Sequence, residues 1–146
     1  MAYKLNKPQI LAKQKQVNML TIASDPKNVA SVEPFVEKVF KRYQINPDMY
    51  GNILITLTEA VTNAIIHGND RDQSKKVKVQ LRKLQNTLTF LISDEGPGFD
   101  FEDLPDPTAP ENLMKVGGRG VFLMRQLCDQ VEYHNNGSTV EIHFNI

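Results

Sequence analysis

The spacing of hydrophobic and polar side chains switches along the chain between the two-residue period of strands and the helical period of about 3.6 residues. Asp25 and Asn46 each precede a proline and mark helix starts, because their side chains can cap a helix and proline suits its first turn. Gly68 followed by Asn69 is a typical helix end. In the first half, we therefore expect a strand over residues 17–22 and helices over residues 26–43 and 47–67.

The second half predicts two hairpins with a helix between them. Gln85-Asn86 and Asn135-Asn136-Gly137 are the turn sequences, each flanked by apolar runs rich in β-branched and aromatic residues. The expected strands cover residues 77–83, 87–93, 131–134 and 138–144, and the helix covers residues 118–128. Helices placed before and between hairpins predict an α+β fold, a two-layer α/β sandwich with a mixed, mainly antiparallel sheet and helices on one face.

Composition narrows the class of protein without identifying a function. A chain of 146 residues with 40% hydrophobic content predicts one domain, here residues 17–146, after an N-terminal tail over residues 1–16. Seventeen basic residues balance seventeen acidic ones, so no overall charge attracts nucleic acid or an anionic membrane. The single cysteine excludes an internal disulfide, and no apolar run approaches the roughly 20 residues of a membrane span. We expect a soluble, cytoplasmic protein.

Glu59 and Asn63 are the first candidates for chemistry. At about 100° per residue, two side chains four residues apart project within roughly 40° of each other on a helix. The apolar residues of the same helix fall on its opposite side and are expected to face the sheet. A carboxylate and an amide oxygen on one face could serve as a general base and a Mg²⁺ ligand, although a solvated helix face has the same pattern. His67 would extend this face by a turn, as a ligand or as a capping group.

Asp94 follows an apolar strand and begins the segment Asp94-Glu95-Gly96-Pro97-Gly98. A carboxylate at a strand end can accept a hydrogen bond from the exocyclic amino group of adenine, whereas guanine has a carbonyl at that position. Gly96 and Gly98 permit a backbone path close to a ligand. The segment therefore predicts an adenine site, and a plain turn is the alternative.

Gly117, Gly118 and Gly120 lie at the start of the third predicted helix, immediately before its apolar run that begins at Val121. The free N–H groups and the dipole of a helix N-terminus favour phosphate. Lys115 and Arg119 are the candidate phosphate-facing cations, and each is equally compatible with solvent exposure. The proline-containing residues 100–117 lack periodicity and are expected to form a lid over the nucleotide. Walker, dinucleotide-fold and eukaryotic protein-kinase signatures do not occur in the sequence.

Taken together, these three segments resemble the N, G1 and G2 boxes of the ATPase superfamily of gyrases, chaperones, histidine kinases and mismatch-repair proteins, which has the Bergerat ATP-binding fold. Within it, the run from Glu59 to Gly68 (EAVTNAIIHG) is similar to the N box of the bacterial anti-sigma factor serine/threonine kinases. The resemblance covers roughly residues 17–144. Arg119-Gly120-Val121 departs from the pattern, because many relatives have a glycine followed by Leu-Gly or Met-Gly there.

The resemblance implies ATP and Mg²⁺ as cofactors and assigns roles to residues of this chain. Asn63 would be the magnesium ligand, Glu59 the base that activates an acceptor serine or threonine, and Asp94 the adenine contact. The close backbone approaches to the nucleotide would be at Gly96, Gly98, Gly118 and Gly120.

Our first hypothesis is a kinase that phosphorylates an anti-anti-sigma-type protein and sequesters a sigma factor when that partner does not occupy it. We also expect this protein to form a homodimer, and that expectation rests on the resemblance alone. The alternative is a nucleotide-gated binding regulator without phosphotransfer. A detached histidine-kinase catalytic domain is a third hypothesis, disfavoured because no phosphoacceptor helix precedes the boxes.

Overall fold

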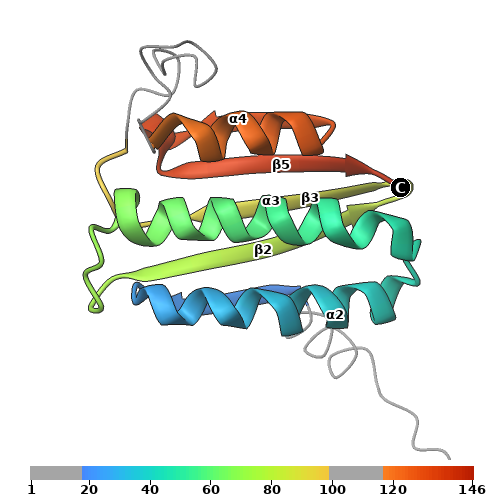
Figure 1. The fold of residues 1–146 in the computed structure, drawn as a ribbon, viewed down its shortest axis with the longest axis horizontal. Coiled ribbons are helices and arrows are strands. Elements are labelled where there is room, and N and C mark those ends of the chain that lie inside the picture. Colours follow the sequence, from blue (N-terminus) through green and yellow to red (C-terminus); the bar gives the residue numbers. More distant parts are fainter. Residues whose placement is uncertain (1–17, 99–116) are drawn as a thin grey trace, which may run out of the picture.

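The fold is an antiparallel sheet with helices packed on one of its faces, seen in a computed structural model that describes residues 18–98 and 117–146 (Figure 1). The strands are β1 (Met19–Ala23), β2 (Lys76–Leu84), β3 (Thr87–Ser93), β4 (Gln130–His134) and β5 (Thr139–Asn145). Their order in the sheet is β1-β2-β3-β5-β4, and every pairing in the described part of the chain is antiparallel. The sheet predicted as mixed and mainly antiparallel is thus antiparallel wherever the structure describes it.

The helices α2 (Val32–Tyr43), α3 (Tyr50–Asn63) and α4 (Gly117–Leu127) lie side by side over the sheet, with α3 in the middle (Figure 1). This arrangement confirms the predicted two-layer α+β sandwich. Within residues 18–98 and 117–146, no helix has the length and apolar content needed to cross a membrane. The predicted tail (1–16) and most of the predicted lid (100–117) lie outside the described residues.

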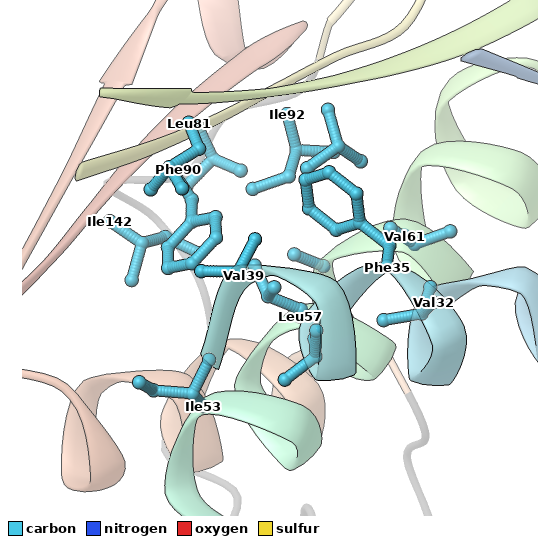
Figure 2. Close-up of a cluster of buried hydrophobic side chains, with 14 of the residues drawn as sticks. Val32, Phe35, Val39, Ile53, Leu57, Val61, Leu81, Phe90, Ile92 and Ile142 are labelled. Carbon is cyan, nitrogen blue, oxygen red and sulfur yellow. The ribbon is translucent and has the colours of Figure 1, made fainter. Parts of the chain in front are cut away.

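The core fills the space between the helices and the sheet (Figure 2). Every second side chain is buried along β3 and β5 and along β2 as far as Leu81. Ile53, Leu57 and Val61 of α3 are 0% exposed and belong to the same core cluster as the buried residues of these strands. Burying one such aliphatic side chain contributes about 1.5–3 kcal/mol, so the apolar face of α3 fixes which of its residues remain outside the core.

Both predicted helix starts are confirmed, but the first helix is interrupted. Oδ1 of Asp25 accepts from the backbone N–H of Lys27 at 3.1 Å, as a capping carboxylate should. Residues Pro26–Ser31 form a 3₁₀ helix, and the α-helix begins only at Val32. Pro34 explains the break, because a proline inside an α-helix clashes with the carbonyl four residues earlier and is tolerated only in the first turn.

The second predicted helix also changes character along its length. The regular α-helix α3 ends at Asn63, and Ala64–Gly68 form a π-helical turn in which the backbone N–H of Asn69 donates to the carbonyl of Ala64 at 2.8 Å. A π turn is wider than an α turn and is often found at functional sites. The α-helical register therefore stops at Asn63, and the expectation that His67 extends the face of Glu59 and Asn63 stays a prediction. The His67 side chain is exposed.

Candidate functional site

Glu59 and Asn63 lie one turn apart near the end of α3, at the border of its buried face. Both side chains are half-buried. Within the described ranges, neither has a hydrogen-bond or ion-pair partner. The pair is thus available to a ligand or to solvent, as the sequence predicted.

Asp94 lies directly after β3, where the sequence placed it. Its backbone N–H donates to the carbonyl of Ser138 at 2.9 Å, and its Oδ1 accepts from the backbone N–H of Gly96 at 2.8 Å. Burial raises the pKa of the Asp94 carboxyl above its usual value, and the Gly96 hydrogen bond and the charge of Lys75 oppose this only in part. Oδ2 has no hydrogen-bond donor among the described residues, so the carboxylate retains an acceptor for a ligand.

Three glycines allow close contacts between the loop after Asp94 and the two segments beside it, the π turn and the β4–β5 turn. A Cβ atom at Gly68 would overlap the carboxylate of Asp94, and a Cβ atom at Gly96 would overlap the backbone carbonyl of Gly68. Gly98 has φ +85°, a left-handed conformation that favours glycine, and it approaches the carbonyl of Asn136 in the β4–β5 turn. The loop is therefore enclosed between the π turn on one side and the β4–β5 turn on the other.

The third predicted segment is described only as backbone. Helix α4 begins at Gly117, so Gly118, Arg119 and Gly120 form its first turn. The helix predicted over residues 118–128 is thus confirmed to within one residue at each end. The helix N-terminus itself is confirmed, and α4 runs alongside α3 (Figure 1). Lys115 lies outside the described residues.

Sequence reasoning missed two residues that hold the loop in place. Gly68 was interpreted only as a helix terminator, although its missing side chain makes room for the Asp94 carboxylate. Asn69 was assigned to the same helix end, but it is 0% exposed and its side chain makes several hydrogen bonds. A buried asparagine after a helix is a weak signal, because the same residue is common in solvent-exposed turns.

The residues present fit a nucleotide and a metal ion. Asp94 offers a half-buried carboxylate oxygen without a described partner, which suits the amino group of adenine. Asn63 offers an amide oxygen, a ligand type that Mg²⁺ accepts. The Asp94 carboxylate lies against Gly68, which is five residues beyond Asn63 in the chain.

Comparison with known protein families shows to which family this chain belongs. The family profile described as "Histidine kinase-like ATPase domain" matches residues 22–144. This chain belongs to the histidine kinase-like ATPase family. Membership confirms the superfamily that the three segments resembled and makes ATP the nucleotide expected at this site.

Curated relatives within the histidine kinase-like ATPase family include proteins named Serine-protein kinase RsbW. The protein from Bacillus subtilis (strain 168) is 27% identical over 128 residues, which cover 83% of this chain and 80% of the relative. The protein from Staphylococcus aureus (strain MRSA252) is 27% identical over 131 residues, with coverage of 84% and 82%. These relatives agree with the resemblance of the N box to anti-sigma factor kinases.

The solved structure of the catalytic domain of the histidine kinase ThkA, in a nucleotide-free form, is also similar. It superimposes with a TM-score of 0.52 at 16% identity and covers 87% of this chain and 96% of the ThkA domain. At that identity the likeness concerns the fold alone, and it confirms the ATPase-type α+β architecture of the family.

Proposed function

We propose that this protein is an ATP- and Mg²⁺-dependent protein kinase that transfers the γ-phosphate to a serine or threonine of a protein partner. One observation supports this more than any other: the loop of Asp94 packs directly on the end of the segment that carries Glu59 and Asn63. This contact supports the proposal that the candidate adenine-binding carboxylate and the candidate catalytic pair belong to one site.

Each residue of the site has a role in the proposed reaction. Asp94 accepts from the adenine amino group, Asn63 holds Mg²⁺, and Glu59 accepts the proton of the attacking hydroxyl. The hydroxyl oxygen forms a bond to the γ-phosphorus, the bond to the β–γ bridging oxygen breaks, and ADP leaves. Bound Mg²⁺ neutralises phosphate charge, and the protein otherwise contributes positioning. In the proposed site, backbone N–H groups in the first turn of α4, which includes Gly118, Arg119 and Gly120, donate to phosphate oxygens, as the free N–H groups of a helix N-terminus can.

The proposed substrate is an anti-anti-sigma-type protein in the cytoplasm, and the proposed second partner is a sigma factor that is held when the substrate is absent. The name Serine-protein kinase of the relatives supports the acceptor residue. The sigma factor and a homodimer rest on the resemblance of the run from Glu59 to Gly68 to anti-sigma factor kinases.

The proposal is tested by phosphotransfer from γ-labelled ATP into proteins of the source-cell lysate, with Mg²⁺ and with excess EDTA. We expect one small labelled protein, seen only with Mg²⁺, whose label has the acid stability of phosphoserine or phosphothreonine. Sequencing that protein would identify the partner. Absence of label, in a preparation that binds ATP, would instead indicate the nucleotide-gated binding regulator.

Base recognition by Asp94 predicts a pH dependence of ATP binding. The carboxylate accepts more strongly from adenine when it is ionised, and burial raises its pKa, so affinity should begin to fall in milder acid than an ordinary aspartate would require. Below that pKa, each further pH unit should weaken binding by up to about tenfold. Calorimetric titration of wild type and Asp94→Asn separates this effect from titration of ATP itself, which affects both proteins equally. Parallel pH curves for the two would exclude Asp94 as the titrating group.

A further inference from the structure

Asn69 is a buried polar residue that joins three separate segments of the chain. Its Nδ2 donates to Oγ of Ser24 at 2.8 Å and to the carbonyl of Lys76 at 3.0 Å. Its Oδ1 accepts from the backbone N–H of Glu95 at 2.7 Å. The amide orientation follows from these partners, since the Glu95 N–H can only donate and the Lys76 carbonyl can only accept. Both ends of the Asn69 amide are thus satisfied in a site that excludes water.

These bonds fix the backbone on both sides of Asp94. The N–H of Asp94 is held by the carbonyl of Ser138 at 2.9 Å, and the next N–H along the chain, that of Glu95, is held by Asn69 at 2.7 Å. The backbone of a residue has only two free dihedral angles, φ and ψ. Fixing the directions of its own N–H and of the N–H of the next residue therefore restricts both angles. The Asp94 side chain therefore projects in a direction determined by two anchors, of which Asn69 is the one that comes from the helical segment.

The Asn69 anchor is reinforced through Lys76. The Lys76 carbonyl accepts from Asn69, and the Lys76 N–H donates to Oε2 of Glu95, so the three residues form a closed ring of hydrogen bonds. Lys76 begins β2 and is paired with Ala23 of β1. The loop of Asp94 is thereby attached to the edge of the sheet as well as to the π turn.

We propose that Asn69 is a positioning residue for base specificity: it holds the Asp94–Glu95 peptide so that the Asp94 carboxylate faces an adenine amino group. This inference rests on the proposed ATP site. Asn69 acts through Asp94 and does not touch the phosphates, so its loss should affect ATP, ADP and adenosine alike. The Mg²⁺ dependence of binding should be unchanged.

The test is the ratio of ATP affinity to GTP affinity, measured by calorimetry for wild type, Asn69→Ala and Asn69→Asp. We expect Asn69→Ala to lower the ratio by about tenfold, since a mispositioned carboxylate loses most of a charge-assisted hydrogen bond. Asn69→Asp retains an oxygen that accepts from the Glu95 N–H, so it should retain the ATP-to-GTP ratio of wild type. It lacks the amide donor to Ser24 and Lys76, so the protein should be less stable.

Ser24→Ala is the matched control, because Ser24 is also 0% exposed and bonds to Asn69 on the side away from the loop. It should lower the melting temperature without changing the ATP-to-GTP ratio. An unchanged ratio in Asn69→Ala, or an equal fall in Ser24→Ala, would overturn the role of Asn69 alone. A wild-type protein that binds neither nucleotide would overturn the proposed function and this inference with it.

Hydrogen exchange tests the inference even if Asn69→Ala does not fold. In wild type the Glu95 amide should be protected from exchange, and adenosine should slow its exchange further. Exchange of the Glu95 amide at the rate of a free peptide, in a protein that binds adenosine, would show that no bond from Asn69 holds the loop.

Discussion

Glu59→Gln is expected to retain Mg²⁺-ATP affinity and to lose phosphotransfer by about 10²–10⁴-fold, the usual contribution of a general base. Glutamine has nearly the size of glutamate and keeps one acceptor oxygen, but it cannot take up the hydroxyl proton. Glu59 is half-buried and has no described partner, so the change breaks no interaction seen within the described ranges. Single-turnover transfer to the labelled partner and calorimetric ATP binding, on the same preparation, measure the two effects separately.

Two further variants make this result specific. Glu37→Gln removes an exposed carboxylate from α2 and should leave transfer unchanged. Asn63→Ala should instead weaken the Mg²⁺-dependent part of ATP binding, because the proposed metal ligand is removed. Equal transfer rates for wild type and Glu59→Gln would remove Glu59 from its proposed role and leave proton transfer to solvent or to the nucleotide itself.

The features that could be predicted from sequence are those set by neighbouring residues. The hairpin turn at Gln85 is confirmed, with φ 51° at that residue, and so is the turn at Asn135 and Asn136, with φ 52° and 59°. The helix starts at Asp25 and Asn46 are also confirmed, because capping depends on side chains within three residues of the cap. Pro34 was a local signal as well, and the break before Val32 could have been predicted from it.

The parts of the site that sequence reasoning missed depend on contacts between distant segments. Gly68 is required because Asp94, 26 positions later in the chain, occupies the place of its side chain. Asn69 bonds to residues on both sides of it in sequence, at Ser24 and Glu95. The π turn of Ala64–Gly68 is another such feature, since hydrophobic spacing does not distinguish it from an α turn.

Gly96→Ala is expected to disrupt the site strongly, although it adds only a single methyl group. The added Cβ would overlap the backbone carbonyl of Gly68 and would lie 3.0 Å from Oδ1 of Asp94. Because the first obstacle is backbone, the π turn and the loop must separate, and the Asp94 carboxylate must move with them. Overpacking of this kind costs about 1–3 kcal/mol of stability. Loss of the Asp94 contact should weaken ATP binding by about a further ten- to hundredfold.

Gly51→Ala is the matched control for this substitution. Gly51 lies in the first turn of α3, and a Cβ atom there would have no neighbour within 4 Å. Replacing a helical glycine by alanine in open space should raise stability by about 0.5–1 kcal/mol and leave ATP affinity unchanged. Thermal unfolding of the two variants would therefore give shifts of opposite sign, and only Gly96→Ala would weaken ATP binding in the titration. If Gly96→Ala unfolded and bound ATP like wild type, the close packing of the Asp94 loop on the π turn, on which the proposed site depends, would be wrong.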